Sequence, residues 1–166
     1  MSFSIKDSKP SSQHKSGKYK LVNPDKYIGL ESDIQYRSSY ELAAYEIFDL
    51  DPNVIRWIAE SDKIKIPYVS TIDKKHHHYF PDAYVEIKTI KGNNIKKYVF
   101  EIKPKSKLVR PIEPRPPVSP QKRKAYNRKL KSYIEIMQKK KAAIKWCEIR
   151  GFQYEFMTED FLFKHK

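Results

Sequence analysis

Two short runs of apolar and aromatic residues, 83–90 and 95–102, form the clearest pattern along the chain. Both runs are rich in Val, Ile, Tyr and Phe, and Lys-Gly-Asn-Asn at 91–94 separates them. Short runs of this composition on either side of a turn-forming cluster are typical of a β-hairpin. The pattern therefore predicts two antiparallel strands joined by a tight turn.

Three charged side chains of this hairpin are candidates for a catalytic site. Pairing Ile90 with Ile95 predicts a register that places Asp82 opposite Lys103. Because side chains alternate between faces, Asp82, Glu101 and Lys103 share one face, with neighbours roughly 5 to 7 Å apart. Two carboxylates can share a divalent cation, and a lysine can orient the attacking water in phosphodiester hydrolysis. An ordinary hairpin with a solvated charged face is the alternative interpretation.

A third acidic residue lies where a helix is predicted to begin. Residues 36–51 carry apolar side chains at helical spacing. Glu41 stands near the start and could contribute a further carboxylate to the hairpin. It also stands three residues after Ser38, which fits a capping box in which Glu41 only supports the helix terminus. The two interpretations compete directly.

Further segments complete one α/β domain with a mixed sheet flanked by helices. Residues 54–58 and 64–69 are predicted strands on either side of a polar turn, and 152–156 alternates like a last strand. Residues 121–150 are the longest helix candidate. Its apolar stripe is predicted to pack in the core: Tyr126, Leu130, Tyr133, Met137, Ile144 and Cys147.

Two segments differ in composition from this domain, which we assign to residues 21–166. Residues 1–20 are polar, rich in Ser and Lys, and without a hydrophobic period, which predicts a flexible basic arm. Residues 104–120 are rich in proline and basic side chains, which predicts a stiff, extended connector. The connector could lie along a DNA backbone, hold a protein partner, or serve only as a spacer.

The net charge of the chain indicates which class of binding partner to expect. The chain has 34 Lys and Arg residues against 20 Asp and Glu residues, a net charge of +14. This excess favours a polyanion, although proteins that only bind nucleic acid share it. The polar face of the long predicted helix is a plausible phosphate-binding surface, through Lys122, Arg123, Lys124, Arg128 and Lys131.

The sequence argues against disulfides, zinc sites and membrane-spanning segments. The single cysteine, Cys147, excludes an internal disulfide and a thiolate zinc cluster. At most two of the side chains of His76, His77 and His78 could reach one ion from a strand, so a solvated loop or a phosphate contact is favoured over zinc. No apolar stretch has the length of a signal peptide core or a membrane span, so no membrane association is predicted.

Five motifs in order along the chain carry a family resemblance. They are Tyr-Arg-Ser-Ser-x-Glu at 36–41, Asp-Leu-Asp-Pro-Asn-Val-Ile-Arg-Trp at 49–57, Ile-Pro-Tyr-Val-Ser at 66–70, His-x-Tyr-Phe-Pro-Asp at 77–82 and Glu-Ile-Lys-Pro-Lys at 101–105. This ordered set resembles the head completion nucleases of T4-type bacteriophages. Those proteins are similar to the catalytic domain of the Tn7-type transposition endonuclease, within the PD-(D/E)XK superfamily.

The resemblance implies a restriction-endonuclease-like fold and a set of site residues. Glu41, Asp82 and Glu101 would be acidic metal ligands, joined by the backbone carbonyl of Ile102, with Lys103 as the catalytic lysine. The implied cofactor is Mg²⁺, with Mn²⁺ as the alternative ion. Three residues within or beside the motifs are predicted to contact DNA: Arg37, His78, which stands where the family pattern suggests Arg, and Lys105.

The implied function is hydrolysis of packaged or terminal double-stranded DNA during phage head completion. Phage head, portal or neck proteins would be partners, in the host cytoplasm during infection and in association with the virion. Two alternatives remain. One is a site-specific endonuclease subunit of the transposition type, and the other is a neck or capsid protein that binds DNA without cleaving it.

Overall fold

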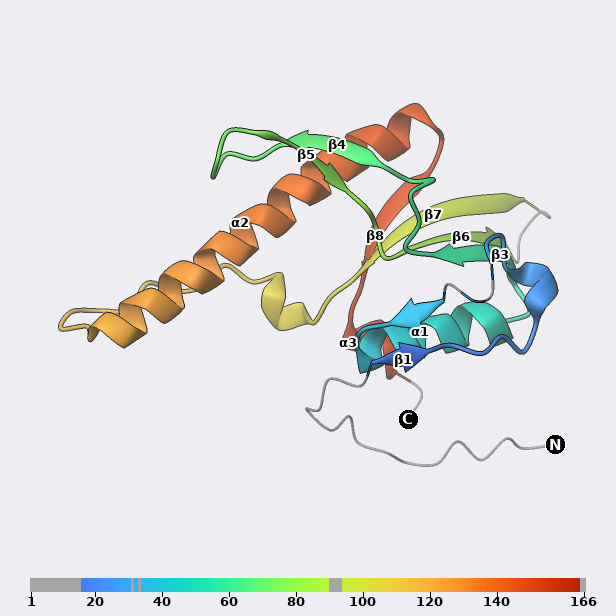
Figure 1. Ribbon diagram of the computed structural model, residues 1–166, viewed down its shortest axis with the longest axis horizontal. Coiled ribbons are helices and arrows are strands. Elements are labelled where there is room, and N and C mark those ends of the chain that lie inside the picture. The colour runs from blue at the N-terminus through green and yellow to red at the C-terminus, as the bar shows by residue number, and fades with distance from the viewer. Residues whose placement is uncertain (1–15, 31, 33, 90–93, 165–166) are drawn as a thin grey trace.

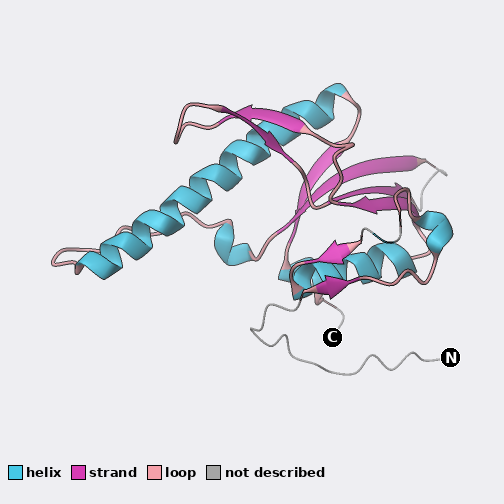
Figure 2. Ribbon diagram, viewed as in Figure 1, coloured by secondary structure: helices cyan, strands magenta, loops and turns pink. Residues whose placement is uncertain are grey.

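The centre of the molecule is a four-stranded sheet in the order β3-β6-β7-β8 (Figures 1 and 2). The computed structural model describes residues 16–30, 32, 34–89 and 94–164. The sheet strands are β3 (Val54–Ala59), β6 (Ala83–Lys88), β7 (Ile95–Ile102) and β8 (Gln153–Met157). Only β8 runs parallel to its neighbour β7, and the other two pairs are antiparallel. The predicted mixed sheet of a restriction-endonuclease-like domain is confirmed.

One face of this sheet packs against α1 (Ser39–Leu50), and the main core lies between them. Alternate residues of the strands supply this face, including Val85 and Phe100, which are buried against Phe48 and Trp57. Large aromatic side chains account for much of the apolar area that stabilises such a core. The short helix α3 (Glu159–Leu162) follows β8 and packs beside α1. Phe163, which follows α3, packs edge-to-face against Tyr40 at the start of α1.

The segment that precedes α1 is tied to the domain by a buried carboxylate. Asp49 accepts hydrogen bonds from the Tyr19 hydroxyl and from the backbone N–H groups of Val22 and Asn23. This segment contains β1 (Gly17–Lys18), paired with β2 (Gln35–Tyr36), and the short helix η1 (Pro24–Lys26). The predicted flexible arm over 1–20 therefore extends too far along the chain, because Tyr19 is buried in the core. Residues 1–15 lie outside the described part.

The opposite face of the sheet is covered by a second, two-stranded sheet and by α2 (Pro120–Ile149). The small sheet pairs β4 (Ile66–Val69) with β5 (His76–Tyr79). The predicted strand over 54–58 therefore does not pair with its sequence neighbour, because β3 pairs with β6 instead. The three histidines form a strand rather than a loop, and the His77 ring lies 2.8 Å from the carboxylate of Asp73.

The first half of α2 extends away from the sheet, as the orange part of the helix shows in Figure 1. The fully buried residues of this helix, Ala143 and Cys147, lie in its second half. The predicted core stripe is therefore wrong for the first half, and Ile144 is also exposed. The connector, which includes η3 (Lys105–Lys107), runs out from the end of β7 and leads to the start of α2. We call residues 104–135 the prong.

In the part of the chain that the structure describes, no helix has the length and apolarity needed to cross a bilayer.

Candidate active site

The β6–β7 hairpin places two of the candidate acids across from each other. Ala83 pairs with Phe100 and Lys88 pairs with Ile95, so the same register continued by one residue puts Asp82 opposite Glu101. The predicted register, with Ile95 opposite Ile90 and Asp82 opposite Lys103, is wrong by two residues. The predicted turn was placed one residue too far along the chain, because the backbone N–H of Thr89 already donates to the carbonyl of Asn94. A shift of two residues leaves every side chain on its predicted face.

Asp82, Glu101 and Lys103 meet in the structure. The Lys103 ammonium lies 2.9 Å from Glu101 Oε1 and 3.5 Å from Asp82 Oδ2. The side chains of Asp82 and Glu101 are 14% and 8% exposed, so both charges are largely removed from water. A buried carboxylate is stable only when it is paired or hydrogen-bonded. One ammonium therefore neutralises only part of the charge of two neighbouring carboxylates.

The electrostatics of the site reflect this excess of negative charge. Burial, and then the neighbouring Glu101 carboxylate, raise the pKa of Asp82 to about 7, although Lys103 and the Ile102 N–H oppose the shift. Burial acts to lower the pKa of Lys103, but the two carboxylates outweigh burial and hold it above the usual value. A second cation near Asp82 and Glu101 would favour the ionised form of Asp82.

Pro81 precedes Asp82 and cannot donate a backbone hydrogen bond to the neighbouring strand. Continued by two residues beyond the last observed pair, the register would place Ile102 opposite Pro81, in a position where the two residues of an antiparallel pair exchange backbone hydrogen bonds. Proline has no N–H to donate to the Ile102 carbonyl. The N–H of Ile102 donates instead to Asp82 Oδ2, at 2.7 Å. Since N–H and C=O of one strand residue point to the same side, the Ile102 carbonyl lies on the side of β7 that faces β6.

Glu41 is held at the start of α1 in a variant of a capping box. The hydroxyl of Ser38 accepts a hydrogen bond from the N–H of Glu41 at 3.1 Å. In return, Glu41 Oε2 accepts from the N–H of Arg37 at 2.8 Å, and Oε1 lies 3.2 Å from the Ser38 hydroxyl. Across the described residues, no group of three or more His, Cys, Asp or Glu side chains is placed to hold a metal ion. The structure thus shows Glu41 in its capping role, although its charge contributes to the raised pKa of Asp82.

Two tyrosines and a lysine join the site without having been predicted. The Tyr79 hydroxyl donates a short hydrogen bond to Glu101 Oε2 and lies 3.2 Å from the Tyr154 hydroxyl. The Lys139 ammonium sits 5.6 Å from the centre of the Tyr79 ring. Burial and the Glu101 charge raise the pKa of Tyr79, so it remains a donor. The position of Tyr79 just before Pro81-Asp82 was the available sequence signal, whereas Tyr154 is brought in only by the parallel pairing of β8.

The predicted DNA contacts fall into two groups. Three of these residues form ion pairs on the surface. Arg37 makes two 3.1 Å contacts with Glu60, Lys105 lies 2.7 Å from Asp160, and Arg123 lies 2.7 Å from Glu113. Exposed ion pairs of this kind are weak and exchange readily for a phosphate. The other predicted residues are exposed, His78 on β5 and the rest on the first half of α2: Lys122, Lys124, Arg128 and Lys131.

Comparison with known proteins gives two matches. A family model described as "TnsA-like endonuclease N terminal" matches residues 51–159, a range that contains Asp82, Glu101 and Lys103 but not Glu41. The chain is also 31% identical over 145 residues to the head completion nuclease of Enterobacteria phage T4, which covers 87% of this chain and 91% of that relative. No solved structure matches the chain. The resemblance predicted from the five motifs is confirmed.

Proposed function

The chain belongs to the family of TnsA-like endonucleases and head completion nucleases, and from this premise we propose that it is a metal-dependent DNA endonuclease of phage head completion. The proposed substrate is packaged or terminal double-stranded DNA, and the reaction is hydrolysis of a phosphodiester bond. The observation that carries the proposal is the buried pair of Asp82 and Glu101, which shares the single ammonium of Lys103.

The residues at the hairpin end fit a hard divalent cation. Mg²⁺ and Mn²⁺ prefer oxygen ligands such as carboxylates and backbone carbonyls. Asp82, Glu101 and the carbonyl of Ile102 are the residues that would hold the ion. The raised pKa of Asp82 supports this assignment, because its causes are first burial and then the Glu101 charge, and a bound cation would offset both. Glu41 would join after exchanging its contacts with the Arg37 N–H and the Ser38 hydroxyl.

Each protein group has a distinct part in the proposed reaction. A bound Mg²⁺ supplies positive charge to a phosphate oxygen and lowers the pKa of a water molecule. Lys103 donates hydrogen bonds from a position beside both carboxylates, where it can orient the water or stabilise charge on the phosphate. Tyr79 holds one oxygen of Glu101 and leaves the other toward Lys103. In hydrolysis, the water oxygen forms a bond to phosphorus, and the bond from phosphorus to the deoxyribose oxygen breaks.

The prong and the second half of α2 are the proposed DNA-binding surface. The prong has ten basic and two acidic residues, much of the excess positive charge of the chain. Lys139 brings this surface to the site itself, since it lies over the ring of Tyr79. Contacts to phosphates position a duplex without reading its sequence. This supports a nuclease with little intrinsic base specificity.

The biological setting is also part of the proposal. The T4 relative is a head completion nuclease, which supports action on DNA at the phage head, with head, portal or neck proteins as partners. The protein would act in the host cytoplasm during infection and associate with the virion. The match to the TnsA-like family favours one alternative, a site-specific endonuclease subunit that depends on partner proteins to select its site.

The proposed activity can be measured with the purified protein. Circular plasmid and linear DNA should both be cleaved in Mg²⁺ and remain intact in EDTA. Cleavage of both forms without added partners supports the head completion assignment over the transposition type. A folded protein that binds DNA but leaves both forms intact with Mg²⁺ and with Mn²⁺ would support a non-cleaving structural protein instead.

A further inference from the structure

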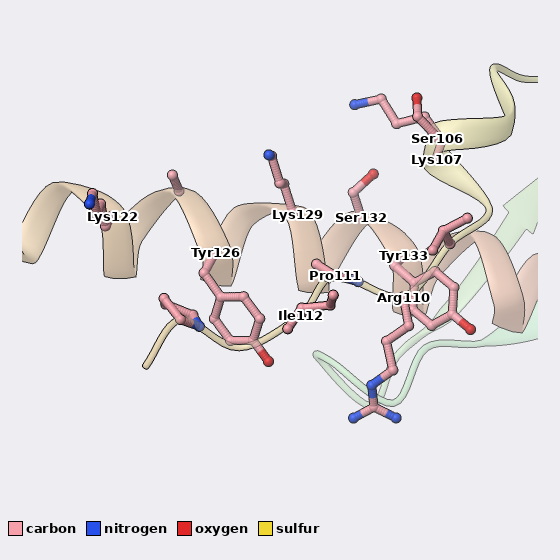
Figure 3. Close-up of a pocket in the computed structure, with 13 residues that line it drawn as sticks. Ser106, Lys107, Arg110, Pro111, Ile112, Lys122, Tyr126, Lys129, Ser132 and Tyr133 are labelled. Carbon is pink, nitrogen blue, oxygen red and sulfur yellow. The ribbon is translucent and has the colours of Figure 1, made fainter. Parts of the chain in front are cut away.

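A groove runs along the prong, between the connector and the first half of α2 (Figure 3). Its volume is about 600 Å³. Thirteen residues line it, from Ser106 at the connector end to Tyr133 on the helix, and none of these thirteen is acidic. This volume is in the range of sites that hold small ligands or a few groups of a chain, and it is too small to admit a DNA duplex. The groove is separate from the acidic site at the hairpin end.

Both walls of the groove carry positive charge. Lys107 and Arg110 come from the connector, and Lys122 and Lys129 come from the helix. Glu113, the acidic residue of the connector, does not line the groove. Its carboxylate lies 2.7 Å from the guanidinium of Arg123. A groove with cationic walls and no acidic lining attracts a chain of anionic groups.

Two tyrosines on the helix give the groove an aromatic surface. Tyr126 and Tyr133 are seven residues apart, so they lie on the same side of α2 with about 10 Å between them along the axis. Both rings point from the helix toward the connector in Figure 3. They are half-buried and belong to neither core cluster of the described residues. Basic grooves with spaced aromatic side chains are the general means of binding single-stranded nucleic acid, because bases stack on the rings and phosphates meet the cations.

Along the chain, the groove begins close to the candidate active site. Ser106 lies only three residues after Lys103, at the start of the connector. From there the lining extends along the helix back to Lys122, about 16 Å from Tyr133 by the rise per residue. Because three residues span at most about 10 Å, a DNA strand bound at Asp82 and Lys103 would lie close to the start of the groove.

We infer that this groove binds a single-stranded segment of DNA, such as an unpaired end or flap, that adjoins the duplex at the active site. The inference rests on the proposed function for its biological setting, but the binding itself requires no cleavage. It adds a substrate class to that proposal, namely DNA with a single-stranded extension. Bases stack on Tyr126 and Tyr133, and phosphates contact Lys107, Arg110 and Lys129.

The test measures binding in EDTA by fluorescence anisotropy, with a labelled single strand of about 12 nucleotides, the same strand lacking its bases, and a blunt duplex of equal length. The wild-type protein should bind the strand with bases at least about fivefold more tightly than the abasic strand, as expected for one stacked base. Changing Tyr126 and Tyr133 together to Leu should remove this difference and leave duplex affinity unchanged. The double change to Phe should retain it.

Two controls separate stacking from charge and from damage to the fold. Lys107→Gln with Lys129→Gln should weaken binding of strands with and without bases alike, because these side chains contact phosphates. Lys88→Gln with Lys96→Gln removes two exposed charges at the far end of the hairpin and should leave single-strand affinity nearly unchanged. Equal melting temperatures of the Phe and Leu variants would show that the prong keeps its packing.

The outcomes are distinct for the groove and for the nuclease assignment. Equal affinity of the wild-type protein for strands with and without bases, or unchanged single-strand binding by the folded Leu variant, would overturn the groove inference. So would equally effective displacement of the strand by polyglutamate, which would indicate an acidic protein segment as the partner. Loss of cleavage with intact single-strand binding would count only against the proposed nuclease function.

Discussion

Tyr79 holds the Glu101 carboxylate through its hydroxyl, from a strand that belongs to a different sheet. The same hydroxyl lies 3.2 Å from that of Tyr154, and the ring of Tyr79 carries the ammonium of Lys139 on its face. The two-stranded sheet and the long helix are thus connected to a candidate metal ligand on the central sheet. Their packing determines where that carboxylate points.

Removing this hydroxyl tests whether Tyr79 orients Glu101. Tyr79→Phe keeps the ring and its packing but removes the donor to Glu101. Loss of a group that orients a metal ligand lowers metal affinity or activity by about 10- to 100-fold. Cleavage in limiting Mg²⁺ should fall within this range, while DNA binding in EDTA stays unchanged. Tyr154→Phe is the control and should have a smaller effect, because the Tyr154 hydroxyl contacts that of Tyr79, whereas Tyr79 donates to Glu101 itself. Equal rates for the wild type and Tyr79→Phe would remove Tyr79 from the site.

Glu41 separates a structural from a catalytic role. Glu41→Gln retains an oxygen that can accept from the Arg37 N–H, and Gln is accepted at this position of a capping box. It removes the negative charge that a metal ligand requires. We expect cleavage to collapse while the melting temperature barely changes. Ser38→Ala is the comparison, because it removes the cap and should lower stability by about 1 kcal/mol. Full activity of the Gln variant would leave Glu41 with the capping role alone.

The raised pKa of Asp82 predicts a pH dependence of stability in the metal-free protein. Its pKa rises from 3.8 to about 7 on folding, because of burial and the Glu101 charge. Between these values the folded protein keeps a proton that the unfolded chain has lost. The free energy of unfolding should therefore fall as the pH rises from about 4 to about 7. Asp82→Asn should flatten this fall, as measured by thermal melting across this range. Parallel profiles of the two proteins would contradict the assignment.

The basic face of the prong predicts a salt dependence of DNA binding. Four exposed residues of α2, Lys122, Lys124, Arg128 and Lys131, are each expected to neutralise one phosphate. Changing all four to Gln should lower the magnitude of the slope of log K against log salt by roughly 3 to 4. Folding should survive, because Gln is a good helix former. The change of Lys88 and Lys96 to Gln should leave the slope nearly constant. A constant slope in the quadruple variant would mean that this face meets a protein partner or solvent.

The hairpin shows how far local sequence determines the site. The alternation of side chains predicted that Asp82, Glu101 and Lys103 share a face, and they do. The partner of Asp82 was predicted wrongly, because the register depends on where the loop closes, and the backbone bond from Thr89 to Asn94 closes it earlier than the turn residues suggested. An error of two residues leaves each side chain on the same face of the hairpin. The grouping of the three side chains was therefore predicted correctly although the register was wrong.

The pattern of the sequence could not predict contacts between residues that are far apart along the chain. Tyr154 reaches the site because β8 pairs in parallel with β7, more than fifty residues away along the chain. The apolar stripe of the long helix predicted core packing over its whole length, but half of that helix leaves the sheet and forms one wall of the groove along the prong. Helical periodicity identifies an apolar face and cannot identify what covers it. The Pro-rich connector, which could have been a spacer, forms the opposite wall of that groove.

The central claim is that Asp82 and Glu101 are metal ligands of a nuclease. Asp82→Asn and Glu101→Gln keep the size of each side chain and remove one negative charge each. Supercoiled plasmid should be cleaved in Mg²⁺ at least about 100-fold more slowly by either variant than by the wild type, since even groups that only orient a ligand can cost that much. Both variants should remain folded and should bind DNA in EDTA as the wild type does. Wild-type rates of cleavage by both folded variants would contradict the claim.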